Sequence, residues 1–209
     1  MDKKVALFKA KRRRMFFLGF AAFVIVFGAY VVLFLWPQLQ WTWDVRDPYL
    51  DIMEKSNSPE YKAEIRSWFD RTYNFTELYD WVDKELEFIP VGVSFERHTD
   101  PIEIAQSGKG RCGEFSILYV AACLAHGYES RIVVAVDFSN PLALQYPHVW
   151  AEVKLDRWVH VDPSPRTFWN QSQRYLTWPW GSGIGQNVRI YAFEDGNFQE
   201  VTSNYAPAD

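Results

Sequence analysis

The 209-residue chain contains 48% hydrophobic and 23% charged residues, a composition that predicts a folded protein and excludes general disorder. Its net charge of -4 is unevenly spread: residues 1–14 hold seven Lys or Arg and one Asp, a local charge of +6, which leaves -10 for the remainder. An acidic folded part argues against contact with a phosphate backbone, so we expect no nucleic-acid partner.

The chain has two cysteines, Cys112 and Cys123. If one helix carries both, they lie roughly 16 Å apart at about 1.5 Å per residue. A disulfide requires Cα atoms within about 7 Å, so the two thiols do not bridge each other. Two cysteines are also too few for a zinc site built from two CxxC pairs. We therefore expect no metal or cofactor, and at least one thiol that is available for chemistry.

Residues 15–36 are the first predicted element, a transmembrane helix. This stretch of 22 residues has no charge, and a membrane span needs roughly 20 apolar residues. The basic segment 1–14 precedes it directly and is expected to be a cytoplasmic tail. Trp36, Trp41 and Trp43 suit the opposite membrane interface. We therefore expect a single-pass protein of the cell membrane, in contact with the lipid bilayer, with its N-terminus cytoplasmic and its main domain extracytoplasmic.

A cleaved signal peptide is the alternative for this segment. Its apolar region would be shorter, about 7–15 residues, and would end in small residues. Here the run ends in Phe-Leu-Trp-Pro at 34–37, without such a site. The sequence therefore favours an anchor that is retained.

The remainder divides into a linker at 37–57, marked by Pro37 and Pro48, and a domain at 58–209. Capping residues and apolar periodicity predict α-helices, and alternating β-branched and aromatic residues predict strands. One expected helix starts at Ser58, and three others cover 76–87, 101–106 and 112–126. The expected strands cover 131–138, 148–155, 158–162, 188–194 and 197–203. These elements make an α+β domain, in which helix 112–126 is apolar on all sides and should be central.

Cys112 is the candidate nucleophile, because it stands where a glycine-rich turn becomes a helix. A helix N-terminus supplies unpaired N–H groups and a positive dipole end, which favour the thiolate. Arg111 lies beside the cysteine, and Gly113 leaves its approach open. The alternative is that Cys112 is only a small buried residue. Cys123 lies in the middle of the same helix among apolar residues and is expected to be inert.

A cysteine nucleophile needs a base, usually histidine, and a third group that orients the ring. Among the four histidines, His148 begins a strand after a proline, an edge position suited to catalysis. Because side chains alternate along strands, a three-residue loop 155–157 would pair Lys154 with Trp158 and bring Asp162 diagonally beside His148. A two-residue loop would put the two on opposite faces. We therefore predict the three-residue loop or a bulge; the alternative for Asp162 is a turn residue before a proline.

Three motifs then resemble the transglutaminase-like superfamily, whose triad is Cys, His and Asp in that order: GRCGEF at 110–115, HVWAEV at 148–153 and WVHVDP at 158–163. Within it, residues 100–205 look most like the peptide:N-glycanases. The resemblance implies a transglutaminase or papain-like core, in which the cysteine-bearing helix packs on an antiparallel sheet. It also implies that Cys112, His148 and Asp162 release the N-glycan from asparagine of a glycoprotein and leave aspartate. The paired CxxC zinc ligands of that family have no counterpart here.

Two other functions remain open. The first is a thiol protease or an amide cross-linking acyltransferase of the same fold, acting on protein substrates. The second is a catalytically silent, membrane-tethered binding domain.

Trp169, Trp178 and Trp180 in the aromatic, glycine-rich tail are candidates for stacking on sugar rings. The alternative for these tryptophans is packing over the domain edge.

Overall fold

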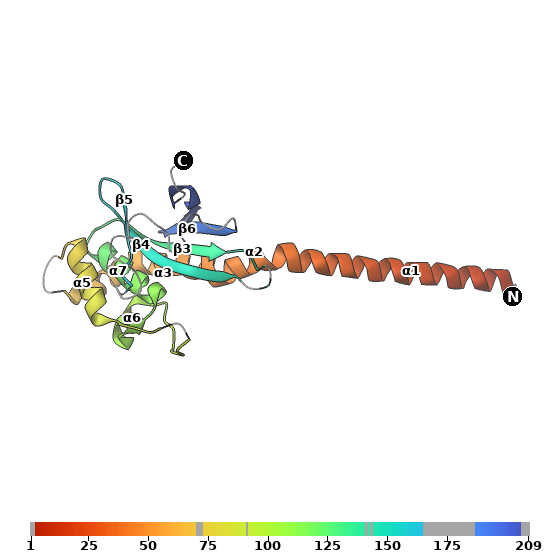
Figure 1. Ribbon diagram of the computed structural model, residues 1–209, viewed down its shortest axis with the longest axis horizontal. Helices are drawn as coiled ribbons and strands as arrows, with labels where there is room; N and C mark the ends of the chain where they lie inside the picture. Colours follow the sequence, from red (N-terminus) through yellow and green to blue (C-terminus); the bar gives the residue numbers. More distant parts are fainter. Residues whose placement is uncertain are drawn as a thin grey trace.

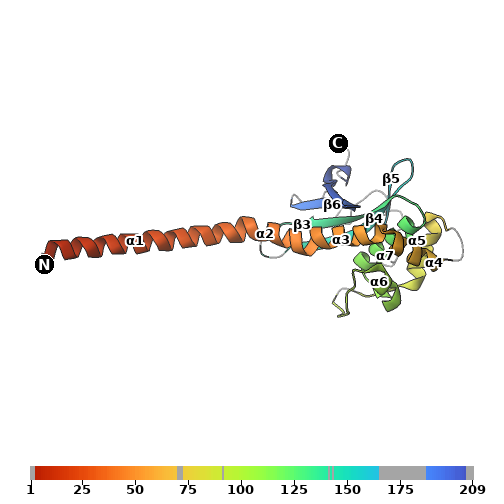
Figure 2. The same ribbon diagram turned by 180° about the vertical axis from the view of Figure 1, so that it is seen from behind.

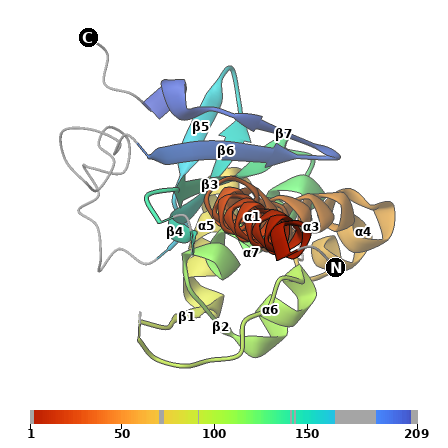
Figure 3. The same cartoon turned by 90° about the vertical axis from the view of Figure 1, so that its right-hand side faces the viewer.

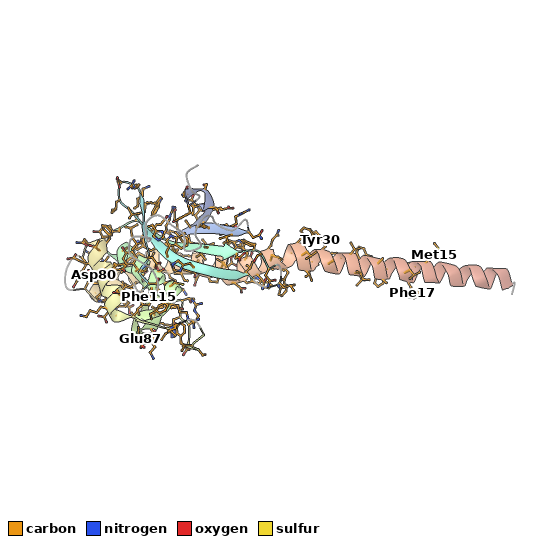
Figure 4. All side chains as sticks on the ribbon, viewed as in Figure 1. Met15, Phe17, Tyr30, Asp80, Glu87 and Phe115 are labelled. Atoms are coloured by element: carbon orange, nitrogen blue, oxygen red, sulfur yellow. The ribbon has the colours of Figure 1, made fainter. Side chains whose placement is uncertain are left out.

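The computed structural model describes residues 3–69, 73–90, 92–140, 142, 144–164 and 187–205. A long N-terminal helix projects from a mixed domain of helices and strands (Figures 1 and 2). Met15, Phe17 and Tyr30 lie on the projecting part, whereas Phe115 lies inside the domain (Figure 4). The large apolar side chains from Met15 to Tyr30 are exposed, which is the pattern expected of a helix that faces lipid.

The N-terminal helix is continuous from the projecting part into the domain. It consists of α1 (Lys3–Tyr30), a π-helical turn at Val31–Leu35, α2 (Trp36–Gln40), a second π-helical turn at Trp41–Arg46, and α3 (Asp47–Asn57). Pro37 and Pro48 each follow a π-helical turn. Proline lacks an N–H and its ring crowds the carbonyl four residues earlier, and a widened turn relieves that crowding without breaking the helix.

The structure differs here from the predicted linker at 37–57. Val45, Ile52 and Met53 are buried in the main hydrophobic core. The Trp41 ring lies 4.2 Å from the Tyr191 ring, centroid to centroid. Packing of an apolar face therefore overrides the local signal of the two prolines, and the end of the long helix is a structural part of the domain.

Five antiparallel strands form the main sheet, in the order β5-β4-β3-β6-β7. They are β3 (Ser130–Asp137), β4 (Gln145–Lys154), β5 (Trp158–Val161), β6 (Val188–Glu194) and β7 (Asn197–Glu200). A 3₁₀ turn, Thr202–Tyr205, follows β7. A short parallel pair, β1 (Glu87–Phe88) and β2 (Lys109–Gly110), lies apart from this sheet. The predicted strands are confirmed, with shifts of a few residues at their ends.

The helices gather on one side of the sheet, around α7 (Figure 3). They are α4 (Pro59–Ser67), α5 (Phe75–Glu85), α6 (Pro101–Ser107) and α7 (Cys112–Ala125). Side-chain caps from Ser58, Asn74 and Asp100 start α4, α5 and α6, because each accepts hydrogen bonds from the first-turn N–H groups. Gly108 ends α6 in the left-handed region, with φ of +62°.

Helix α7 is the central element, as its uniformly apolar sequence predicts. Every residue from Gly113 to Ala125 is buried, and the helix contacts α3, α4, α5, α6, β3 and β4. Strand β3 alternates between two cores: Ile132 and Val134 face α7, and Val133 and Ala135 face the opposite side. The fold is therefore α+β, with the cysteine-bearing helix packed on an antiparallel sheet.

Candidate active site

Cys112 is the first residue of α7, and its side chain is partly exposed. The junction before it is firmly held. The Arg111 N–H donates to Glu114 Oε2 at 3.0 Å, and the Arg111 guanidinium donates to the carbonyls of Ile89, Pro90 and Val93. The predicted position of Cys112 at a helix N-terminus is thus confirmed, and the thiol has a fixed location.

His148 and Asp162 meet across β4 and β5. Strand pairing matches Lys154 with Trp158 and Ala151 with Val161, so the predicted three-residue loop is confirmed. Continuation of that register brings Asp162 diagonally beside His148. The Nε2 atom of His148 lies 2.7 Å from Oδ2 of Asp162.

Ser164 completes the environment of Asp162. Its N–H and its hydroxyl donate to Oδ1 of the carboxylate, at 3.0 and 2.5 Å, so that His148 and Ser164 occupy different oxygens. Burial raises the pKa of Asp162, but the bonds with His148 and Ser164 outweigh burial and hold the pKa below its ordinary value of 3.8. The carboxyl group is therefore ionised throughout the neutral range.

The His148 ring also has the Cys112 side chain as a hydrogen-bond partner. Burial alone would lower the pKa of His148. The hydrogen bonds with Asp162 and Cys112, and the electrostatic interaction with each, more than offset burial and raise the pKa of His148 from 6.5 to about 10. The imidazole is consequently a cation at neutral pH, placed between a carboxylate and a thiol.

Ser116 fixes the distance between the two halves of the site. It lies one turn after Cys112, and its hydroxyl contacts the Cys112 carbonyl at 2.7 Å and the Val149 carbonyl at 3.1 Å. Val149 is the residue next to His148. Neither Ser116 nor Ser164 stands out in the sequence by a motif; the single serine inside the apolar run 115–125 is the one signal that points to Ser116.

The remaining thiol and histidines have other surroundings. Cys123 is buried, and burial raises the pKa of its thiol to about 12, in line with the expected inert role. His98 pairs with Glu103, and His126 contacts the Ala122 carbonyl. His160 packs beside the Trp150 ring. Among the residues that the structure describes, His148 is the histidine bonded to Cys112.

A polar network lies behind His148. The Trp150 ring stacks on His148 and its Nε1–H donates to the Tyr205 hydroxyl, which in turn contacts Glu152. Arg131 is buried between Glu152 and Glu194, with N–O distances of 2.7 and 2.6 Å. Buried charges of this kind are stable only when paired, so the network ties β3, β4, β6 and the C-terminal turn together.

The arrangement of thiol, imidazole and carboxylate is suited to nucleophilic attack on a carbonyl carbon. No group of three metal-binding side chains occurs within the described ranges. Trp169, Trp178 and Trp180, the expected sugar-stacking residues, lie outside the described residues.

Comparison with known proteins identifies the family. The family model of the transglutaminase-like superfamily matches residues 60–163. The peptide-N(4)-(N-acetyl-beta-glucosaminyl)asparagine amidase of Arabidopsis thaliana is 31% identical over 99 residues, which cover 42% of this chain and 12% of that protein. The amidase of the same name from Candida glabrata is 32% identical over 115 residues, covering 49% and 30%. The chain thus spans less than a third of the length of either relative.

A chain in a structure of the Rad4/XPC nucleotide excision repair complex has a similar fold. Its TM-score is 0.51 at 14% identity, and the match covers 85% of this chain and 50% of that chain. At this identity the likeness concerns the fold alone.

The match of the family model over residues 60–163 includes Cys112, His148 and Asp162, and with the two amidase relatives it establishes that the chain belongs to the transglutaminase-like superfamily.

Proposed function

We propose that this chain is a membrane-anchored thiol amidohydrolase with Cys112, His148 and Asp162 as its triad. The observation that carries the proposal is the His148 ring, which is bonded to the Asp162 carboxylate at 2.7 Å and to the Cys112 side chain. The proposed substrate is a glycosylated asparagine in a glycoprotein or glycopeptide. Support for this substrate comes from the relatives named peptide-N(4)-(N-acetyl-beta-glucosaminyl)asparagine amidase.

In the first half of the proposed reaction, the Cys112 thiolate attacks the side-chain amide carbon of the asparagine. The backbone N–H of Cys112, at the start of α7, donates to the developing oxyanion. The His148 imidazolium then gives its proton to the amide nitrogen. The C–N bond breaks, the glycan leaves as a glycosylamine, and the acyl group stays on Cys112 as a thioester.

Water completes the cycle. His148, now neutral, takes a proton from a water molecule, whose oxygen attacks the thioester carbon. The C–S bond breaks, aspartate is released, and Cys112 and His148 return to the thiolate and the imidazolium. Asp162 keeps the imidazole oriented and stabilises its positive charge in both halves. The side chains of Trp169, Trp178 and Trp180 are proposed to stack on the sugar rings.

The anchor is proposed to be the N-terminal helix. Within the described residues, Met15–Asn57 is a helix long and apolar enough to cross a membrane, and its most apolar window is not buried in the domain. The basic segment 1–14 would keep the N-terminus in the cytoplasm, which puts the domain outside. A signal sequence would meet the same length test. N-terminal sequencing of the mature protein separates the two, and protease protection of intact cells reports the side on which the domain lies.

A glycopeptide assay tests the activity. The full chain in detergent is incubated with an N-glycosylated peptide, and the products are analysed by mass spectrometry. We expect conversion of the linkage asparagine to aspartate and release of the intact glycan. Cys112→Ala should abolish both, whereas the matched variant Cys123→Ala should retain them because its thiol is buried in the core.

Other products would assign another function. Cleavage of the peptide chain would indicate a protease, and an isopeptide product would indicate a cross-linking acyltransferase. Alkylation of Cys112 by iodoacetamide at about pH 6 supplies an independent check, because an activated thiolate reacts there much faster than an ordinary thiol. A rate no higher than that of free cysteine, with no product in either assay, would favour the silent binding domain.

A further inference from the structure

Arg97 lies beside the proposed nucleophile but is outside the three sequence motifs. Its Nε–H donates to Oε1 of Glu114 at 2.7 Å. The two side chains differ in exposure: that of Arg97 is 58% exposed and that of Glu114 is 1% exposed. The second oxygen of Glu114 accepts the Arg111 N–H at 3.0 Å. A buried, fully bonded carboxylate in the first turn of α7 therefore holds the guanidinium in one place.

The guanidinium extends over Gly113, the residue after the thiol. A Cβ atom built on Gly113 would lie 2.9 Å from Nη2 of Arg97 and 3.8 Å from the Tyr49 hydroxyl. The space above Gly113 is thus filled by the Nη side of the guanidinium, with Tyr49 of α3 on its border. Burial lowers the pKa of Arg97, but Glu114, Tyr49 and Cys112 together raise it, which also indicates that the cation lies close to the thiol.

Glu114 uses only part of the donor capacity of Arg97. A guanidinium has five N–H groups. Within the described part of the chain, the Nη groups of Arg97 have no hydrogen-bond partner, while Nε is bound by Glu114. Arg111 adds a second positive charge at this end of α7, and its guanidinium contacts carbonyls rather than carboxylates. Arg97 and Arg111 thus place two positive charges at this end of α7, and Glu114 is the carboxylate that both of them contact.

From this geometry we infer that Arg97 is a specificity-determining residue, which binds a carboxylate on the substrate next to the bond attacked by Cys112. The chemistry is that of a planar guanidinium, whose paired N–H donors match the two oxygens of a carboxylate. The group bound would be an acidic side chain or a free chain terminus flanking the reacting amide. The inference deepens the proposed function and depends on it for the identity of the reacting bond.

Alkylation of Cys112 by a charged and a neutral reagent tests the subsite without a known substrate. Iodoacetate carries a carboxylate and iodoacetamide does not, and both transfer the same kind of group to sulfur with loss of iodide. Rates are measured for the full chain in detergent by mass spectrometry of the Cys112 peptide. We expect the ratio of the iodoacetate rate to the iodoacetamide rate to exceed that of free cysteine.

The variant Arg97→Gln should lower the iodoacetate rate about tenfold or more, the size expected for a lost charge-assisted hydrogen bond, with little change for iodoacetamide. Arg97→Lys should lie between, because lysine keeps the charge but lacks the planar fork. The double variant Arg97→Gln/Glu114→Gln should behave like Arg97→Gln without leaving a buried carboxylate unpaired. His148 is unchanged in all three, so its attraction for iodoacetate cancels in the comparison.

Arg66→Gln is the matched control, because it removes one arginine charge at the opposite end of α7, where Arg66 donates to the Ala125 carbonyl. Both rates should remain as in the unaltered chain. An equal fall of both rates in Arg97→Gln, persisting in the double variant, would overturn the subsite in favour of a structural role, and so would an unchanged ratio. Failure of the proposed function would show in the iodoacetamide rate of the unaltered chain, whereas failure of the subsite shows in the ratio.

Discussion

His148 is the residue at which the two ends of the site meet. Its imidazole is bonded to Asp162 and to Cys112, and its pKa is raised from 6.5 to about 10. A raised pKa means that the folded state favours the protonated ring. The bonds to His148 therefore add to the free energy of unfolding. This contribution is present in full below pH 6.5 and is lost as the pH rises through about 10. The proposed proton donor is available over the same range.

Asp162→Asn is expected to shift this range. Loss of the carboxylate removes the charge that, with Cys112, keeps the ring protonated, so the pKa of His148 falls and the alkaline limb of the activity profile moves to lower pH. Turnover should fall by about 10²–10⁴-fold, as when the acid of a comparable triad becomes an amide. Activity against pH, with an NMR titration of His148, measures both effects.

The control for this prediction is Asp156→Asn, which changes an exposed aspartate in the β4–β5 turn. It should leave the pH profile in place. An unchanged alkaline limb in Asp162→Asn would mean that Asp162 does not set the protonation state of the ring.

At the residue scale, the motifs and the alternation of side chains along the strands predict the three residues of the candidate site. They do not predict the neighbouring residues whose contacts position those three. Cys112, His148 and Asp162 each stand in a motif whose spacing carries information. Ser164 and Arg97 do not, because a single serine after a proline or a single arginine in a loop has many uses. Their contacts depend on how segments distant in sequence approach each other, and only the folded chain defines that approach.

Among the elements, α7 and β4 matter most, because one carries the thiol and the other the imidazole. Ser116 joins them by contacting the Val149 carbonyl at 3.1 Å inside the core. A hydrogen bond between buried groups leaves an unsatisfied acceptor when its donor is removed. The position of Cys112 relative to His148 therefore depends on one hydroxyl group as well as on apolar packing.

Ser116→Ala should reduce the free energy of unfolding by about 1–3 kcal/mol, the usual cost of leaving one buried polar group unpaired. It should also slow Cys112 alkylation at about pH 6, since α7 can shift against β4 and weaken the contact of the thiol with the imidazolium. Urea unfolding and iodoacetamide labelling measure the two effects. Ser67→Ala is the control: its exposed hydroxyl contacts the Glu64 carbonyl three residues earlier, and its change should stay within about 0.5 kcal/mol. Equal stability losses in the two variants would contradict the proposed link.

The elements also show where sequence rules succeed and fail. Runs of β-branched and aromatic residues predict β3 to β7, although burial differs among them: β3 is buried along almost its whole length, β5 is half-buried and β7 is largely exposed. The rule that proline ends a helix fails at Pro37 and Pro48, because two π-helical turns absorb the prolines and the helix continues as α3. Burial of Val45, Ile52 and Met53 supplies a stabilisation that a local rule does not count.

For the whole molecule, one continuous helix joins the proposed membrane anchor to the domain. The proposed membrane helix runs without a break into α3, whose residue Tyr49 borders the space above Gly113. A flexible linker would let the site reach substrates at many heights above a bilayer. A continuous helix instead fixes that height, so the proposed enzyme should act on glycoproteins close to the membrane surface.

The proposed orientation further predicts that the β3–β4 loop touches the lipid interface. The Trp36 Nε1–H donates to the Leu142 carbonyl at 3.3 Å, and the Leu142 side chain is 59% exposed. Trp36 ends the apolar run, and tryptophan settles at the bilayer edge, so Leu142 should lie at that depth.

A polarity-sensitive dye on Leu142→Cys, in a Cys112→Ala/Cys123→Ala background in lipid nanodiscs, should emit as in an apolar environment and be quenched by headgroup-labelled lipid. The same dye on Leu155→Cys, an exposed position in the β4–β5 turn, should report water. Identical solvent-like emission from both sites would show that the domain stands clear of the bilayer, and a dye at Phe23→Cys on α1 would then reveal whether that helix is in lipid at all.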